Sequence, residues 1–400
     1  MGCVYIIGTL DTKADELHYA KQRVEAAGAC AVIVDVGTRG DSIGADIGAA
    51  EVAAFHPRGA KAVLGLSDRG EAIGAMATAL VGFLRQRDDI AAVLGLGGTG
   101  NTALVTQGMR ALPIGIPKLM VSTVASGNTA AYVGPNDIAM MYSVVDVAGL
   151  NDISRRVIGN AAHAIAGMAL NIVPLPENSK PTVAMTMFGV TTECINQVRR
   201  RMEKTHEVYV FHATGVGGQS MEKLVDSGFV EGVIDATTTE VSDLLVGGVF
   251  AAMEDRFGAF IRKGIPYVGS VGAVDMVNFG ARETVPAKFA DRRLHLHNSL
   301  VTLMRTTRDE NRAIGAFIVG RLNQCEGHVR FLLPLRGVSA IDAPGQPFHD
   351  PEADAALFEA IRVGWKSTPR RKLVELDLHI NDAAFASALV ENYTEIRKQS

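Results

Sequence analysis

Short apolar segments alternate with amphipathic segments along nearly the whole chain. Runs rich in β-branched residues, such as 4–8, 31–37 and 91–97, precede segments with helical spacing of apolar residues, such as 14–28 and 69–87. Apolar runs of this length are typical of buried strands, and the longer spacing is typical of the helices that cover them. The alternation predicts an α/β fold with mostly parallel, doubly wound sheets.

The same order occurs twice, on either side of a proline-rich segment. The sequence NIVPLPENSKP at 171–181 predicts a linker between an N-terminal domain, 1–176, and a C-terminal domain, 181–400. We expect two related Rossmann-like domains whose strand C-terminal loops face an interdomain cleft, since α/β sheets bind ligands at that edge. The matching segments are 4–12 with 183–192, 31–40 with 207–218, and 115–126 with 264–274.

Composition narrows the class of protein. A net charge of −4 gives no electrostatic case for binding nucleic acid or an anionic membrane. No uninterrupted apolar segment is long enough to span a bilayer, and no signal peptide is visible. The four cysteines (Cys3, Cys30, Cys194 and Cys325) form no CxxC pair, which predicts free buried thiols in a reducing compartment. We therefore expect a cytoplasmic protein.

The segment GLGGTGNT, Gly95 to Thr102, lies between a predicted strand and a predicted helix. It fits the G-x-G-x-x-G dinucleotide pattern, but the next strand ends in Ser122 and Thr123 rather than in an acid for the ribose. It also fits the frame of a P-loop, with Asn101 where the phosphate-binding lysine belongs. A tight turn without a ligand is the alternative interpretation.

Further loops at predicted strand ends are rich in Gly, Thr, Ser and Asn, and together they predict an anion-binding site. We expect Lys13 to supply the charge that Asn101 lacks. The predicted binding residues are Thr9, Asp11, Thr12, Lys13, Gly97, Gly98, Thr99, Gly100, Asn101, Ser122, Ser126, Gly127 and Asn128.

The second half offers weaker candidates. A glycine loop and a strand end predict a second ligand loop formed by Gly215, Gly217, Gly218, Ser220 and Asp235. Thr237 and Glu240 have the spacing of a helix capping box.

His295 and His297 would share one face of a strand, as metal ligands or as a hydrogen-bonded pair. Asp146 ends an apolar run, where a carboxylate binds Mg²⁺ or caps the helix that begins near Asn151. No nucleophile pattern stands out, so the residues do not show a reaction.

Several long motifs occur in a specific order: GTLDTK, VSTVASGNTAAYVG, VVDVAGLN, FHATGVGGQSME, TTTEV, VDMVNFG, HNSLVTLMRTT and DPEADAALF. In these the chain resembles the family of the ATP-binding N-terminal domain of the tomato mosaic virus resistance protein, which has uncharacterised bacterial and fungal relatives. The resemblance covers essentially the whole chain. It implies two α/β subdomains, ATP as ligand, and a homodimer or higher oligomer. Because the plant protein also carries a barrel domain, it implies a separate barrel-domain protein as a partner.

Three functions follow as expectations. The first is a nucleotide-binding protein of unknown activity that holds ATP, with Mg²⁺ as a candidate ion, in the Gly/Thr/Ser-rich loops. The second is an enzyme for a small carboxylate or phosphorylated metabolite, with His295, His297, Asp275 and Asp235 as its polar groups. The third, an NAD-dependent oxidoreductase, depends on the G-x-G-x-x-G pattern alone.

Overall fold

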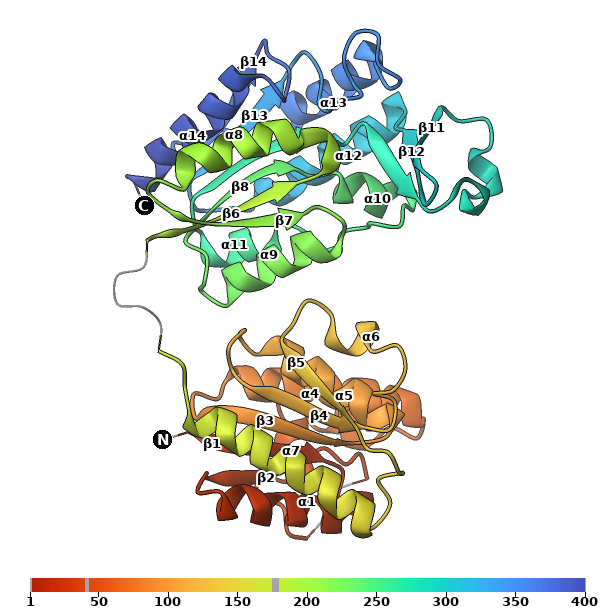
Figure 1. Cartoon of the computed structure of the whole chain (residues 1–400), viewed down its shortest axis with the longest axis vertical. Helices are drawn as coiled ribbons and strands as arrows, with labels where there is room; N and C mark the ends of the chain where they lie inside the picture. Colours follow the sequence, from red (N-terminus) through yellow and green to blue (C-terminus); the bar gives the residue numbers. More distant parts are fainter. Residues whose placement is uncertain (1, 40–42, 175–179, 400) are drawn as a thin grey trace. The chain divides into compact units, whose positions relative to one another are not determined.

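The computed structural model describes residues 2–39, 43–174 and 180–399. The chain forms two compact units, Met1–Leu175 (unit 1) and Pro176–Ser400 (unit 2), each with its own sheet and helices (Figure 1). Residues 175–179 of the predicted linker, 171–181, lie outside the described residues. Each unit is considered by itself below.

Unit 1 is built on a parallel five-stranded sheet in the order β2-β1-β3-β4-β5. Alternate residues of one strand serve opposite faces. Val4 and Ile6 pack with helices α1 and α7, whereas Tyr5 and Ile7 pack with helices α4 and α5. The strands are β1 (Cys3–Gly8), β2 (Ala31–Asp35), β3 (Ile90–Gly97), β4 (Lys118–Ser122) and β5 (Ile138–Tyr142).

Helices α1 and α4 of unit 1 lie on the predicted amphipathic segments 14–28 and 69–87. Asn151 itself caps α7 in a capping box with Ser154, so the alternative that Asp146 caps this helix is wrong. The helices are α1 (Leu10–Ala26), α2 (Ala49–Ala53), α3 (Lys61–Leu64), α4 (Arg69–Arg85), α5 (Thr99–Ala111), α6 (Ala130–Val133) and α7 (Asp152–Leu170).

Unit 2 contains a parallel six-stranded sheet in the order β14-β13-β9-β8-β6-β7. Helices α8 and α14 cover one face, and α9, α11, α12 and α13 cover the other (Figure 1). The strands are β6 (Thr182–Met187), β7 (Glu207–His212), β8 (Gly232–Thr237), β9 (Tyr267–Gly272), β13 (Val329–Pro334) and β14 (Arg371–Leu376).

A small antiparallel sheet interrupts unit 2 between β9 and α12. Its order is β10-β12-β11, with β10 (Met276–Phe279), β11 (Leu294–Asn298) and β12 (Val301–Arg305). The helices of unit 2 are α8 (Thr192–Met202), α9 (Val216–Asp226), α10 (Glu240–Val246), α11 (Gly258–Lys263), α12 (Arg308–Leu322), α13 (Pro351–Gly364) and α14 (Ala383–Arg397).

The two units share one topology. When the strands of the main sheet in unit 2 are counted in chain order, both sheets begin with the spatial order 2-1-3-4-5. The sequence repeats place β1 with β6, β2 with β7 and β4 with β9, and these pairs occupy equivalent positions in the two sheets. The predicted fold of two related, doubly wound α/β units is therefore confirmed.

The cysteines differ from expectation. Cys3 and Cys30 form a disulfide, while Cys194 and Cys325 are buried free thiols. Cys3 begins β1 and Cys30 immediately precedes its parallel neighbour β2, so the sheet pairing itself brings the two residues together. The prediction of four free thiols was wrong for this pair because a spacing of 27 residues carries no local signal. Within the described residues, no helix is both long and apolar enough to cross a membrane.

Candidate anion site and its counterpart

A cavity of about 580 Å³ lies at the carboxyl ends of the strands of unit 1. The sheet order places β1 between β2 and β3, so the connections that leave β1 and β3 pass to opposite faces of the sheet. Such a topological switch point is where doubly wound sheets bind ligands. The cavity is lined by Thr9, Asp11, Thr12, Lys13, Val36, Thr38, Arg39, Leu66, Ser67, Arg69, Ala72, Ile73, Gly98, Thr99, Gly100, Asn101, Leu104 and Asp146.

Two long helices begin at this cavity. The N-cap residues Thr9 of α1 and Gly98 of α5 make no side-chain capping hydrogen bond within the described chain. The first turn of α5 also contains no acidic residue. Free N–H groups and the positive end of the helix dipole therefore favour an anion at the start of α5. The start of α1 differs, because Asp11 lies in its first turn and the N–H of Leu10 donates to Asp35.

Three cationic and two acidic side chains line the cavity. Lys13 has non-helical dihedral angles (φ −139°, ψ 27°) within the first turn of α1, and its Nζ donates to the carbonyl oxygen of Val147. Arg39 follows β2, and Arg69 begins α4. Asp11 and Asp146 supply the carboxylates. The lining therefore has a net positive charge, which suits a phosphate or a carboxylate.

Asp35 holds two of the lining loops in place. It ends β2, is fully buried, and its Oδ1 accepts hydrogen bonds from the backbone N–H groups of Leu10 (3.1 Å) and Gly37 (2.9 Å). One carboxylate oxygen thus fixes the loop after β1 against the loop after β2. Asp35, Arg39 and Arg69 were missed from the sequence, although the position of Asp35 at the end of a predicted strand was a usable signal.

The glycines of the loop after β3 have different roles. A Cβ at Gly95 would lie 2.4 Å from Met120 Sδ, and one at Gly97 would lie 2.7 Å from the Cβ of Asn101. These two positions exclude a side chain because of their own neighbours. At Gly98 the nearest atom would be Thr123 Oγ1, at 3.7 Å, so this glycine leaves open space beside the cavity.

Several predicted residues are brought together in the cavity: Thr9, Asp11, Thr12, Lys13, Gly98, Thr99, Gly100 and Asn101. The Asn101 amide donates to the Leu96 carbonyl oxygen, while its Oδ1 is buried without a partner in the described part of the chain. The predicted residues Gly97, Ser122, Ser126, Gly127 and Asn128 do not line it.

The loop after β4 is held by its own contacts. The buried hydroxyl of Ser122 lies 2.6 Å from that of Thr102 and ties β4 to α5. Asn128 Oδ1 accepts from the N–H of Ala130.

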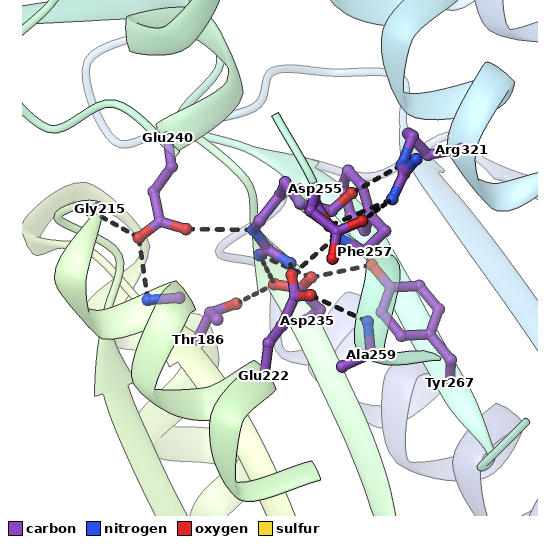
Figure 2. A network of polar contacts seen from close by, with 12 residues as sticks. Thr186, Gly215, Glu222, Asp235, Glu240, Asp255, Phe257, Ala259, Tyr267 and Arg321 are labelled. Carbon is purple, nitrogen blue, oxygen red and sulfur yellow. Dashed lines mark hydrogen bonds and ion pairs between the residues drawn. The ribbon is translucent and has the colours of Figure 1, made fainter. Parts of the chain in front are cut away.

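The predicted ligand loop of unit 2 has an internal partner. The carboxylate of Glu240 accepts hydrogen bonds from the N–H groups of Gly215 (2.7 Å) and Gly218 (3.0 Å) at the start of α9 (Figure 2). A Cβ at Gly217 would lie 1.8 Å from the carbonyl oxygen of His212, so this glycine permits a close backbone approach. Ser220 lies inside α9 and donates to the carbonyl of Val216. A side chain of the protein thus takes the place that an anionic ligand would occupy.

Glu240 belongs to a buried charge cluster centred on Arg256, which we define as Arg256 with Glu222, Asp235 and Glu240 (Figure 2). The guanidinium lies 3.0 Å from Glu222, 2.8 Å from Asp235 and 3.2 Å from Glu240. Asp235 also accepts hydrogen bonds from Thr186 (2.6 Å) and from the hydroxyl of Tyr267 (2.9 Å). All four members are buried, so solvent screens these pairs little.

The pKa values of the Arg256 cluster follow from burial and charge. Burial raises the pKa values of Glu222 and Glu240 and outweighs the nearby guanidinium. Burial opposes the charge on Arg256, but Asp235, Glu222 and Glu240 together raise its pKa well above the ordinary value. Asp235, predicted as a ligand residue, is therefore part of the interior of unit 2. Glu240 makes no capping box with Thr237, whose hydroxyl lies 2.8 Å from that of Thr191.

The two histidines of β11 separate in the structure. His297 lines a second cavity, described below, whereas the ring of His295 lies 6.1 Å from that of Phe348. Asp275 is fully buried, and its Oδ2 accepts from the hydroxyl of Ser339 (2.8 Å). The described residues contain no group of three or more His, Cys, Asp or Glu side chains that is arranged to hold a metal ion.

The fold and the cavity define the class: a doubly wound α/β protein made of two units of like topology, the first with an anion-suited cavity at its strand ends. Residues 2–173 match the N-terminal domain, and residues 180–397 the C-terminal domain, of the uncharacterised protein family UPF0261. The chain belongs to this family.

Relatives come from bacteria and a plant. The chain is 55% identical to a UPF0261 protein of Mesorhizobium japonicum, over 96% of this chain and 97% of that protein. It is 43% identical to one of Clostridium tetani, over 97% of each chain. It is also 44% identical to the ToMV resistance protein Tm-1(GCR237) of Solanum lycopersicum, over 99% of this chain but 56% of that protein. The predicted resemblance to the family of the tomato protein is thereby confirmed, without bearing on a ligand.

Proposed function

We propose that the protein binds ATP, with its phosphates in the cavity at the strand ends of unit 1. One observation carries the proposal: the N-terminus of α5, which has no side-chain cap and no acid in its first turn, meets three cationic side chains in a single cavity. Its volume of about 580 Å³ falls in the range of about 300–1,000 Å³ that is usual for small-molecule sites. The resemblance seen in the sequence supplies the choice of ATP among phosphate ligands.

Phosphates fit best against the start of α5. The N–H groups there point toward the cavity end of the helix, and Gly98 leaves room for an oxyanion. Lys13, Arg39 and Arg69 would neutralise the phosphate charge. Asp11 and Asp146 are oxygen ligands of the kind that Mg²⁺ uses together with phosphates, so we propose that the nucleotide binds with that ion.

Calorimetry tests the proposal directly. The full-length protein, unfolded and refolded to remove any ligand, is titrated with ATP and Mg²⁺, with pyrophosphate and with adenosine. We expect saturable heat with ATP, competition by pyrophosphate, and little binding of adenosine alone, because the cationic side chains that line the cavity would pair with the phosphates. Absence of saturable heat with ATP would overturn the proposal. A shift of NADH fluorescence on addition of protein would favour the oxidoreductase instead.

The alternative of an enzyme for a small metabolite has one observation in its favour. His297, one of the polar groups assigned to it from the sequence, lines a cavity of unit 2. Asp235 and Asp275 do not line that cavity and are fully buried. We therefore treat that cavity as a binding site and assign it no reaction.

A further inference from the structure

A second cavity, of about 230 Å³, lies at the strand ends of unit 2. Its walls come from the segment after β6, the segment after β7, the segment after α10 and the β11–β12 hairpin. Strands β6 and β7 are the counterparts of β1 and β2, so this cavity occupies the same edge of the sheet as the anion site of unit 1. It is lined by Phe188, Gly189, Val190, His212, Thr214, Phe250, His297, Asn298, Val301 and Leu303.

The residues that line this cavity do not suit the phosphate ligand proposed for the first cavity. Among the described residues that line it, none is Lys, Arg, Asp or Glu. Its volume is below the range of about 300–1,000 Å³ usual for sites that hold drug-sized or cofactor ligands, so a single ring fits better than a nucleotide. A phosphate group would find no lysine or arginine there.

The walls favour an aromatic occupant. The ring centroid of Phe188 lies 5.2 Å from that of His212 and 6.3 Å from that of Phe250, the latter pair edge to face. Val190, Val301 and Leu303 complete an apolar surface. A planar ring placed against these aromatic groups gains contact area and a favourable ring geometry that a saturated ring of equal size lacks.

Polar groups at the rim offer hydrogen bonds without a net charge. The imidazoles of His212 and His297 make no hydrogen bond within the portion of the chain that the structure describes. The Thr214 hydroxyl makes only a long contact, 3.4 Å, with the carbonyl of His212. Asn298 adds an amide on the hairpin, whose Oδ1 already accepts from the N–H of Leu300 and whose NH₂ group can donate. These groups can donate to and accept from the edge of an amide or of a ring nitrogen.

We propose that this cavity is a second ligand site, which binds one uncharged heteroaromatic ring with an amide-like edge. Phe188 and Phe250 contact the ring face, and His297 and Asn298 hydrogen-bond its edge. Every residue that lines the site belongs to unit 2.

Saturation-transfer NMR on the full-length protein tests the proposal with nicotinamide as the probe. Cyclohexanecarboxamide carries the same amide on a saturated ring, and inorganic phosphate reports on anion binding. We expect transfer to nicotinamide and at least about fivefold weaker binding of the saturated amide. If nicotinamide shows no transfer, or if both amides bind equally, the proposal is overturned.

Two variants locate the binding. A Cβ at Gly189 would meet no atom within 4 Å, so Gly189→Leu has room to occupy the cavity and should abolish binding. His297 is exposed, and His297→Ala should weaken nicotinamide about tenfold through the lost hydrogen bond without unfolding the chain. The matched control is His295→Ala, on the same strand but outside the lining, which should leave the affinity unchanged.

Two outcomes would place the ring elsewhere. If His297→Ala binds nicotinamide like the parent protein, or if His295→Ala is affected equally, the assigned site is wrong. A variant with a disabled anion site, Gly98→Asp, should retain nicotinamide binding even when it no longer binds ATP. Loss of nicotinamide binding in Gly98→Asp would mean that the ring binds in the cavity of unit 1. The proposal that the protein binds ATP would not be overturned by that result.

Discussion

The two units have the same strand order but use the carboxyl edge of their sheets in different ways. In unit 1, the start of α5 has no carboxylate on it and opens onto a cavity lined by three cationic and two acidic side chains. In unit 2, the start of α9 is satisfied by Glu240, which is itself held by Arg256. Topology therefore fixes where N–H groups gather, while a few side chains decide whether an internal carboxylate or an external ligand meets them.

This contrast explains why glycine-rich loops alone were ambiguous. Gly98 and Gly218 both lie at helix starts after predicted strands. A Cβ at Gly218 would lie 2.0 Å from Glu240 Oε2, whereas one at Gly98 would meet only Thr123 at 3.7 Å. Gly218 makes room for the protein's own carboxylate, and Gly98 leaves room for another molecule.

The largest expected effect comes from a substitution that breaks the Arg256 cluster of unit 2. Arg256→Met leaves three buried carboxylates without their counter-ion, so we expect a loss of about 3–5 kcal/mol in the free energy of unfolding. Urea denaturation measures it. The control Arg262→Met removes a more exposed guanidinium that pairs with Asp226 and Asp255, and it should cost no more than about 1 kcal/mol. Equal costs for the two variants would show that the Arg256 cluster does not stabilise unit 2.

The next largest effect is expected from a substitution that fills the cavity of unit 1. Gly98→Asp places a carboxylate at the start of α5, much as Glu240 lies at the start of α9, and we expect ATP to bind at least about 100-fold more weakly, or about 2.7 kcal/mol. Calorimetry measures the affinity. Gly167→Asp, on α7, adds the same charge at a position with no atom within 4 Å and should bind ATP normally. Unchanged affinity in Gly98→Asp would argue against phosphates at this helix start.

A smaller effect sharpens the role of the cations. Lys13→Ala should weaken ATP about tenfold, because a charge-assisted hydrogen bond contributes roughly 1.5–3 kcal/mol and Arg39 and Arg69 remain. The loss should shrink as salt is raised from 50 to about 300 mM. The control Lys21→Ala is on the same helix, paired with Asp46 outside the cavity, and it should bind ATP like the parent protein. A loss of affinity in Lys21→Ala equal to that in Lys13→Ala would make the effect one of net charge alone.

The smallest effect is a pH dependence confined to unit 2. Burial, with the nearby Asp342 carboxylate, raises the pKa of Asp354 to about 8 and that of Asp275 to about 7. The native state therefore keeps protons that the unfolded chain releases above about pH 4. These two groups thus lower the free energy of unfolding progressively as pH rises from 4 to 8.

Asp354→Asn removes one of these titrations. Relative to the parent protein, the variant should gain at least about 1 kcal/mol between pH 5 and pH 8, as measured by urea midpoints. Asp377, exposed and paired with Arg336, has a lowered pKa and stays ionised in both states over this range. Asp377→Asn should therefore show no such gain, and a parallel gain would contradict the assignment to Asp354.

Local pattern was sufficient for the main elements of unit 1. The alternation of apolar runs with helical spacing predicted β1, α1, β2, α4, β3 and α5, but not the short helices α2 and α3. The repeat alignment placed β6, β7 and β9 at positions equivalent to β1, β2 and β4. These features depend on side-chain periodicity over a few residues, which a single sequence carries.

Long-range partners were beyond the sequence. Glu240 accepts from an N–H group 25 residues away, and Arg69 lines the cavity from the start of α4. Neither contact is implied by periodicity, since both depend on how separate β–α connections pack together. The prediction of the binding residues was limited in the same way. The Thr9–Lys13 segment lines the cavity, while the Ser122–Asn128 loop is held by its own hydrogen bonds.

The disulfide between Cys3 and Cys30 encloses β1 and α1, including the Thr9–Lys13 segment at the start of α1, in one covalent ring. A protease that cuts once inside this ring produces no separable fragment under oxidising conditions, because the bond still joins both pieces. On a denaturing gel the nicked protein would migrate near full length until thiol is added, and it would then release a short N-terminal peptide. The segment that carries Lys13 thus stays tethered to unit 1 even after its backbone is broken.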